Sequence, residues 1–315
     1  MHWSQEATSP ISGRHLNPLP EKPVDGDFRV TFLGTSAASI VPLCSTSACL
    51  VEVGRTRIMV DAGIGALRQL RRVGVSPDNL DAVLLTHWHP DHFAGLCRLV
   101  RARADSAPLL VLGPEPPRPV GLYLRMLCPL AWSSFQPVTN GRSTRISDID
   151  IEPVDTAHRV VSVGWKLDEA YTNRRMVVSG DTRPVGAVLE AARGADLLVH
   201  EATFLGQHRG WAVRHGHSTA WEAATLARES GAGALVLTHT SSRYSMEAIG
   251  LEAEMVYPEA FVASPLTVVS IGQLPDGATR TGHGWAQLSV QVGEGREERI
   301  ARPLFGRGAP VLKAS

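Results

Sequence analysis

Four potential metal ligands fall within six residues of one short segment of this chain. The segment, residues 86–92, has the sequence Thr-His-Trp-His-Pro-Asp-His and directly follows the apolar run of residues 82–85. Imidazole nitrogens and carboxylate oxygens are ordinary ligands of divalent cations. The pattern His-x-His-x-Asp-His should arise by chance in roughly one such chain per thousand. The segment therefore predicts a metal site.

Two metal ions would need more ligands than this segment provides. His87 and His89, two residues apart in an extended turn, can converge on one ion. Asp91 and His92, at the start of a helix, point elsewhere and can serve a second ion about 3.5 to 4 Å away. Such a centre also needs one further histidine on each side and a bridging carboxylate. Three later residues supply that count: His158, His239 and Asp181.

The elements that must position these residues can be predicted from the apolar pattern. Strand-like runs repeatedly end on a histidine or an aspartate, as at Asp61 and His239. Ligands at strand ends are held by a rigid sheet, while the following loops leave an open cleft. We expect strands over residues 28–33, 49–53, 56–60, 82–85, 109–112, 149–154, 160–167, 175–179, 197–200, 234–238, 266–271 and 286–292. We expect helices over residues 63–72, 91–101, 120–130, 185–192 and 218–230, the last with Ser218 as its N-cap.

The composition is that of an ordinary globular protein. The chain has 315 residues, of which 43% are hydrophobic and 20% charged, so it can bury a substantial core. Lysine plus arginine equals aspartate plus glutamate at 31 each. No net field therefore concentrates polyanions on the protein, although a local basic patch is compatible with this balance. Nucleic-acid substrates are disfavoured by the charge but not excluded.

Three regions are expected along the chain. Residues 1–27 are rich in proline, serine and glycine and form an extended N-terminal arm. Residues 28–271 form one domain, and residues 272–315 a glycine-rich C-terminal extension. An arm of this kind can be ordered against a partner subunit, and we expect a homodimer.

The cysteines and the apolar runs predict the cellular compartment. Cys44, Cys49, Cys97 and Cys128 form neither a Cys-x-x-Cys pair nor a dense disulfide framework, so reduced thiols are expected. The N-terminus has no signal-peptide pattern, and no apolar run is long enough to span a bilayer. We expect a cytoplasmic protein with no membrane partner.

The order of the ligand candidates resembles the metallo-β-lactamase superfamily. This order is Asp61, His87-x-His89-x-Asp91-His92, His158, Asp181 and His239. The resemblance covers residues 28–271 and implies an α/β fold, the αββα sandwich of two mixed sheets flanked by helices. It also implies two divalent metal ions, usually zinc, with manganese and iron as alternatives.

Finer motifs narrow the resemblance to the ribonuclease Z family of tRNA 3′ endonucleases. They are Ser-Gly-Asp-Thr-Arg-Pro at 179–184, His-Glu-Ala-Thr-Phe at 200–204, His-Ser-Thr-Ala at 217–220 and Leu-Thr-His-Thr-Ser-Ser-Arg-Tyr at 237–244. The family implies the role of each ligand residue. One zinc would take His87, His89 and His158, the other Asp91, His92 and His239, and Asp181 would bridge them.

The same resemblance implies roles for residues around the metals. Asp61 would orient a ligand imidazole, and Asp91 would also take a proton from the attacking water. Glu201 would hold His217, which would donate a proton to the leaving oxygen. These two form the carboxylate and imidazole of a catalytic pair.

Other residues carry weaker expectations. Arg243 and Tyr244 either contact a substrate phosphate or simply cap their loop. Trp211 and Trp221 are expected to be packing residues. Single histidines outside the motifs are expected at the surface or as satisfied core residues: His200, His208, His215 and His283.

Two departures from the ribonuclease Z pattern leave the substrate open. Residues 166–174 are too short to hold the long tRNA-binding arm common in that family, and residues 37–47 lack an expected Arg-Asn element. One hypothesis is a phosphodiesterase acting on the 3′ end of tRNA or another RNA. A second is a hydrolase of small esters, covering phosphodiesters, sulfate esters, lactones and thioesters. A third, a non-catalytic metal-binding protein, is disfavoured by the complete ligand set.

Overall fold

The computed structural model describes residues 28–37, 45–104, 108–139, 141–272, 288–292 and 296–300. Several predicted features lie outside these ranges: the N-terminal arm, Cys44, His283 and most of the C-terminal extension. The central part of residues 37–47, where the Arg-Asn element is missing, also lies outside them. Within the described ranges, no helix combines the length and the hydrophobicity needed to cross a membrane.

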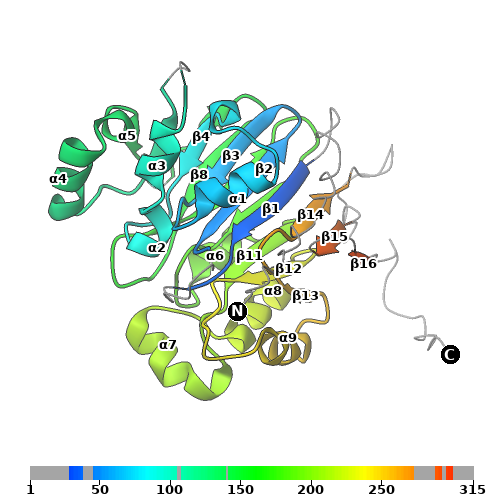
Figure 1. Ribbon diagram of the computed structural model, residues 1–315. Coiled ribbons are helices and arrows are strands. Elements are labelled where there is room, and N and C mark those ends of the chain that lie inside the picture. The colour runs from blue at the N-terminus through cyan, green and yellow to red at the C-terminus, as the bar shows by residue number, and fades with distance from the viewer. Residues whose placement is uncertain are drawn as a thin grey trace, which may run out of the picture.

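Two mixed β-sheets form the centre of the domain (Figure 1). In the first sheet the described strands follow the order β16-β15-β14-β1-β2-β3-β4-β5-β6. Strands β3 to β6 are parallel to one another and the remaining neighbours are antiparallel. The bounds are β1 Phe28–Gly34, β2 Ala48–Val53, β3 Thr56–Val60, β4 Ala82–Leu84, β5 Leu110–Gly113, β6 Phe135–Pro137, β14 Val268–Ile271, β15 Leu288–Val292 and β16 Arg296–Ile300. The last two strands belong to the expected C-terminal extension and continue the sheet beyond β14.

The second sheet has the described order β13-β12-β11-β10-β9-β8-β7. Strands β10 to β13 are parallel, and β7 to β10 are antiparallel. The bounds are β7 Thr144–Ile146, β8 Ile149–Asp155, β9 Val163–Glu169, β10 Arg175–Val178, β11 Leu197–Glu201, β12 Leu235–Thr238 and β13 Ala260–Val262. A five-residue connection, 170–174, joins β9 to β10, so the strands form a hairpin where an arm would otherwise be inserted.

Helices cover the outer faces of both sheets and complete four layers. On the first sheet Leu70 of α1 and Leu96 of α3 pack into one apolar cluster with the strands. On the second, Val188 of α6 and Ala224 of α8 do the same. The bounds are α1 Ala66–Arg72, η1 Pro77–Asn79, α2 Pro90–Phe93, α3 Leu96–Arg101, α4 Arg118–Leu127, α5 Pro129–Ser133, α6 Gly186–Ala191, η2 Gly206–His208, α7 Arg209–His215, α8 Ala220–Ser230 and α9 Met246–Glu254. The expected αββα sandwich is confirmed.

A third apolar cluster fills the space between the sheets. Phe28, Val51, Trp165 and Leu197 are fully buried there. Burial of a large apolar side chain contributes roughly 1.5–3 kcal/mol, so this layer joins the two halves of the chain into one unit. The ligands at the sheet edges are therefore carried by a rigid body.

Three helix predictions were wrong in detail. The helix expected over 91–101 is interrupted before α3, where the backbone N–H of Gly95 donates to the carbonyl oxygen of Ala62 at 2.8 Å and a Cβ at Gly95 would lie 2.3 Å from the carbonyl oxygen of Gly63. The chain must therefore cross residue 63 closely at this point. The N-cap of α8 is Thr219 rather than Ser218, since Thr219 forms a capping box with Glu222. The helix expected over 120–130 is divided into α4 and α5 at Pro129.

Candidate metal centre

The predicted ligands lie at one edge of the sandwich, where both sheets present strand ends. In the first sheet β3 ends before Asp61, and β4 leads into the loop that carries His87 and His89. In the second sheet β10 leads into Asp181 and β12 ends before His239. Because neighbouring parallel strands end on the same side, the site residues of each sheet project from one edge.

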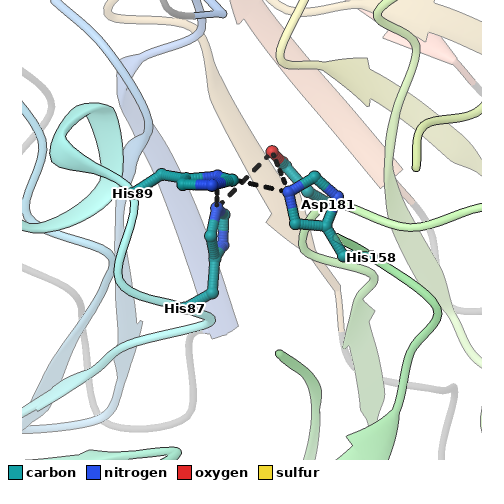
Figure 2. Close-up of side chains that lie close together, drawn as sticks. All are labelled: His87, His89, His158 and Asp181. Carbon is teal, nitrogen blue, oxygen red and sulfur yellow. Dashed lines mark hydrogen bonds and ion pairs between the residues drawn. The ribbon is translucent and has the colours of Figure 1, made fainter. Parts of the chain in front are cut away.

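Figure 2 shows the first group of converging side chains, which comes from both halves of the chain. Nε2 of His87 and Nε2 of His158 lie 2.9 Å and 3.2 Å from Nδ1 of His89. Oδ2 of Asp181 lies 3.7 Å from Nε2 of His87 and 4.0 Å from Nε2 of His158. The four donor atoms are all within 4.8 Å of one another, so they can surround a single ion.

A second group lies on the other side of Asp181. Nε2 of His92 and Nε2 of His239 are 3.2 Å apart. Oδ2 of Asp91 lies 3.6 Å from the first nitrogen and 3.3 Å from the second. Oδ2 of Asp181 is 3.5 Å from each of them. The same carboxylate oxygen therefore faces both groups, as a bridging ligand would.

Hydrogen bonds on the outer side of the rings turn Nε2 of two histidines toward the centre. Nδ1 of His92 lies 2.7 Å from Oδ2 of Asp61, and Nδ1 of His158 lies 2.8 Å from the carbonyl oxygen of Gly216. Both partners can only accept, so each Nδ1 carries a proton and Nε2 is the nitrogen available to a metal ion. Burial opposes charge on His92, yet the Asp181 and Asp61 carboxylates raise its pKa well above the usual value, so metal binding there displaces a proton. This donor set of nitrogens and carboxylate oxygens fits divalent metal ions.

Threonine hydroxyls orient two further rings. Thr86 Oγ1 lies 3.0 Å from Nδ1 of His87 and donates toward Asp61. Thr203 Oγ1 donates to Glu201 at 2.6 Å and lies 2.9 Å from Nδ1 of His239. Each hydroxyl oxygen can thus accept a hydrogen bond from the Nδ1–H of its histidine. These threonines belong to motifs singled out in the sequence, but their role was not predicted.

Two site residues adopt a left-handed backbone. Asp61 has φ 59° and His239 has φ 52°, a region that costs a non-glycine residue about 1–2 kcal/mol. Asp61 is held there by the backbone N–H of Thr86, 2.8 Å from Oδ1, besides its contact with His92. Such strain at a strand end is typical of functional positions.

A carboxylate–imidazole pair stands beside the two groups. Oε1 of Glu201 lies 2.9 Å from Nδ1 of His217 and accepts the backbone N–H of Thr182 at 2.9 Å. Glu201 is buried, and the side chain of His217 is 14% exposed. Nδ1 of His217 is also 3.9 Å from Asp181, but this nitrogen is engaged by Glu201. His217 therefore fits a proton donor at the centre better than a ligand.

Known proteins share this architecture over most of the chain. Residues 56–240 match the beta-lactamase superfamily domain. Ribonuclease Z of Archaeoglobus fulgidus is 30% identical over 75% of this chain and 95% of its own. The chain belongs to the ribonuclease Z family of the metallo-β-lactamase superfamily.

Solved structures agree with this ribonuclease Z assignment. Human tRNase Z, short form, superposes with a TM-score of 0.62 at 28% identity, over 76% of this chain and 98% of that one. The metallo-β-lactamase fold protein YhfI from Bacillus subtilis has a TM-score of 0.70 over 78% of this chain and 99% of its own. At 24% identity the second likeness shows the fold alone.

The electrostatics of this ribonuclease Z family site suit a cation. Burial, followed by the charge of neighbouring histidines, lowers the pKa of His87 well below its usual value, and burial also lowers the pKa of His89 and His158. Neutral imidazoles are the ligand form. Burial opposes charge on Asp181, yet His239, His92 and His87 hold its pKa well below the usual range. The carboxylate therefore stays ionised between the two groups.

His217 differs from the ligand histidines in its protonation. Burial acts to lower its pKa, but the Glu201 carboxylate and then Asp181 raise it to about 9. Both ring nitrogens of His217 are consequently protonated at neutral pH. The ring can donate its Nε2 proton to a leaving oxygen and then be protonated again from water.

The two remaining predicted site residues lie further out. Arg243 is exposed on the loop after β12. Tyr244 is half-buried, and its hydroxyl lies 2.9 Å from Nδ1 of His208 rather than at the metal centre. This geometry gives Tyr244 a role in holding the loop. His208 is thus a partnered residue, and His200 is buried with Nδ1 2.8 Å from the carbonyl oxygen of Glu201.

The expectation that Trp211 and Trp221 are simply packing residues was wrong for about half of each side chain. Their side chains are 51% and 46% exposed. Both lie on short surface helices, α7 and α8, where the inward positions are taken by alanine: Ala212 on α7, and Ala220 and Ala223 on α8. The outward direction of the tryptophans follows from the helical phase, which could not be fixed from so short a segment.

Proposed function

We propose that this protein is a zinc-dependent phosphodiesterase of ribonuclease Z type that cleaves RNA near a 3′ end. The observation that carries the proposal is the position of Asp181 Oδ2, within 4.0 Å of ring nitrogens from His87, His92, His158 and His239, next to the Glu201–His217 pair. A protein that only binds metal ions needs no protonated imidazole beside them. Hydrolysis of a phosphodiester uses the metal ions and the protonated imidazole together.

The proposed ligand assignment follows the two groups of donors. His87, His89 and His158 would hold one ion, Asp91, His92 and His239 the other, and Asp181 both. When bound, two divalent cations supply Lewis acidity and make water nucleophilic near neutral pH. The nitrogen-rich donor set favours zinc over magnesium, with manganese or iron as the alternatives. Metal analysis of purified protein distinguishes these ions.

The chain's own residues carry the proton transfers. Asp91 accepts the proton of the attacking water; its carboxylate stays ionised because, although burial opposes charge, His239 and His92 lower its pKa. Glu201 accepts the Nδ1–H of His217 and so orients the ring, and the raised pKa keeps a second proton on Nε2. His217 donates the Nε2 proton to the oxygen that leaves phosphorus as the new bond to water forms. Asp61 keeps His92 oriented throughout.

A small ester is the second candidate substrate. The connection between β9 and β10 is only residues 170–174, so the domain has no long tRNA-binding arm at this hairpin. A substrate that fits within reach of the metal centre needs no such arm. The ligand residues and the Glu201–His217 pair would serve this hydrolysis equally.

One parallel assay separates the two candidates. The zinc-loaded protein is given a 3′-extended pre-tRNA and a panel of small phosphodiesters, sulfate esters, lactones and thioesters at equal enzyme concentration. We expect cleavage of the pre-tRNA with the highest kcat/KM. Efficient turnover of one small ester with intact pre-tRNA would replace the RNA proposal by the second candidate.

We also propose a homodimer in the cytoplasm. Large apolar side chains of α4 and α5 are exposed together, among them Leu122, Met126, Leu127 and Leu130 at 55–70%, and such patches are typical of association surfaces. Cys49, Cys97 and Cys128 are free, which is common in a reducing compartment. Light scattering after gel filtration gives the oligomeric state, and a monomer would contradict the first part.

A further inference from the structure

Helix α7 projects from the body of the domain (Figure 1). It ends at His215, and its cap Gly216, with a φ of 78°, leads directly into His217. The carbonyl oxygen of Gly216 accepts the Nδ1–H of His158 at 2.8 Å, so the C-terminal end of the helix lies beside the metal centre. Its exposed residues take no part in the proposed reaction, although they stand next to it.

Aromatic rings lead from the solvent-facing side of α7 to the metal centre. Trp211 and His215 are stacked, with centroids 5.8 Å apart and an interplanar angle of 1°. His215 stacks on Phe204 at 6.4 Å and 20°, and Phe204 contacts His217 at 6.0 Å. Exposure decreases over the first three rings, from 51% at Trp211 to 6% at Phe204. The outermost ring thus offers an open face in line with the reaction centre.

Three arginines lie on or beside this helix. Arg159 follows His158, whose Nδ1 lies 2.8 Å from the carbonyl oxygen of Gly216, and Arg243 precedes Tyr244, whose hydroxyl lies 2.9 Å from Nδ1 of His208 at the start of α7. Burial, and then the charges of Arg159, His217, Arg214 and Arg243, lower the pKa of His215. The guanidinium carbon of Arg214 is 5.6 Å from the centre of the Trp211 ring. The three arginines themselves are exposed.

These three arginines take part in no ion pair within the described part of the chain, unlike two other exposed arginines. Arg209, on the same helix, binds Glu222 at 2.7 Å, and Arg193 binds Glu190 at 2.6 Å. No carboxylate within the described ranges neutralises Arg159, Arg214 or Arg243 in this way. Positive charge that is not neutralised, next to an exposed aromatic face, is the combination that binds single-stranded nucleic acid.

We infer that Trp211, Arg214 and His215, the α7 platform, bind an unpaired nucleotide next to the scissile phosphate by stacking on its base. Arg159 and Arg243 contact the flanking phosphates. This inference rests on the proposed function and narrows its substrate to RNA with a single-stranded segment at the cleavage site. A small ester would leave the platform unused.

The test compares two tryptophans of similar exposure. Trp211→Ala removes the platform, whereas Trp221→Ala removes a ring that is 46% exposed over a separate hollow lined by Pro184 and Leu189. Trp211→Phe keeps a stacking face. Binding is measured by anisotropy with a cleavage-resistant phosphorothioate oligoribonucleotide of about eight nucleotides, and hydrolysis with bis(p-nitrophenyl) phosphate reports the intact metal centre.

We expect Trp211→Ala to weaken binding about tenfold, since stacking of one base is worth roughly 1–3 kcal/mol. Trp211→Phe should remain within about threefold of the unmodified protein, and Trp221→Ala should be unchanged. Hydrolysis of the small ester should be equal in all three variants. Failure of the unmodified protein to bind the oligoribonucleotide, or equal binding by the two alanine variants, would overturn the inference.

Cleavage of pre-tRNA separates this inference from the proposed function. If the oligoribonucleotide binds in a Trp211-dependent manner but pre-tRNA stays intact, the platform stands and the endonuclease proposal fails. If Trp211→Ala and Trp221→Ala cleave pre-tRNA with the same KM, the endonuclease stands and the platform fails.

Discussion

At the metal centre His87 and His92 are buried, and Nδ1 of each ring is held by a hydrogen bond. On the α7 platform Trp211 is half exposed, and Arg214 has no carboxylate partner among the residues that the structure describes. The first region is organised so that donor atoms keep one geometry. The second offers a flat ring and exposed guanidinium groups, which accept bases of any identity. Chemistry and substrate binding are therefore placed on differently built parts of the same edge.

The largest expected effect is at the bridging carboxylate. Asp181→Ala removes the oxygen that faces both donor groups, and His87→Ala removes a fully buried nitrogen. Each should reduce hydrolysis of bis(p-nitrophenyl) phosphate by more than about a thousandfold, as removal of a group that acts with others in one unit does. Steady-state rates give the loss and circular dichroism checks the fold. Activity that survives both changes would contradict the ligand assignment.

The next effect separates the proton donor from the ligands. His217→Ala leaves the two donor groups in place, so bound zinc should stay the same by metal analysis. Substrates with poor leaving groups should slow by about 10²–10⁴-fold, the usual contribution of a general acid. Activated nitrophenyl esters, whose leaving oxygen needs no proton, should slow much less. Equal slowing of both classes would indicate a structural role for His217.

A smaller effect on zinc binding is expected for Asp61, which holds the ring of the ligand residue His92. Asp61→Asn keeps the size of the side chain, and asparagine tolerates the left-handed backbone at φ 59°. The change replaces the carboxylate that holds His92 by a neutral group. Zinc affinity should fall by about 10–100-fold, the usual cost of losing an outer partner of a metal ligand. Competition with a chromophoric chelator measures it, and unchanged affinity would mean that His92 is oriented without Asp61.

The smallest expected effect concerns the charge of one arginine, Arg243, beside the α7 platform. Arg243→Ala should reduce the slope of log K against log salt for the single-stranded oligoribonucleotide by about 0.7, the value for one phosphate contact. Arg193→Ala is the matched control, because Arg193 is also exposed but paired with Glu190. If both variants keep the slope, Arg243 makes no phosphate contact.

The two regions also differ in how far the sequence predicted them. The ligands were predicted because a buried strand end restricts both residue type and spacing, as at His87, His89 and Asp181. Family resemblance added Glu201 and His217, which the structure places 2.9 Å apart. The apolar pattern predicted the individual strands and helices, while the sandwich itself came from the family resemblance, and Figure 1 shows that arrangement.

Features that depend on contacts between distant parts of the sequence were not predicted. The interruption before α3 arises because Gly95 packs on Gly63, about thirty residues earlier. The hydroxyl bridges of Thr86 and Thr203 depend on side chains from other strands. The outward phase of Trp211 depends on which face of a seven-residue helix meets the domain. Such contacts join residues far apart in the sequence, so no local pattern reveals them.

The central claim is that two metal ions share Asp181 at this sheet edge. Crystals of the zinc-loaded protein, measured on both sides of the zinc absorption edge, test it most directly. We predict two anomalous peaks about 3.5–4 Å apart, one among His87, His89 and His158 and the other among Asp91, His92 and His239, with Asp181 between them. A single peak at full zinc loading, or peaks away from these residues, would contradict the account.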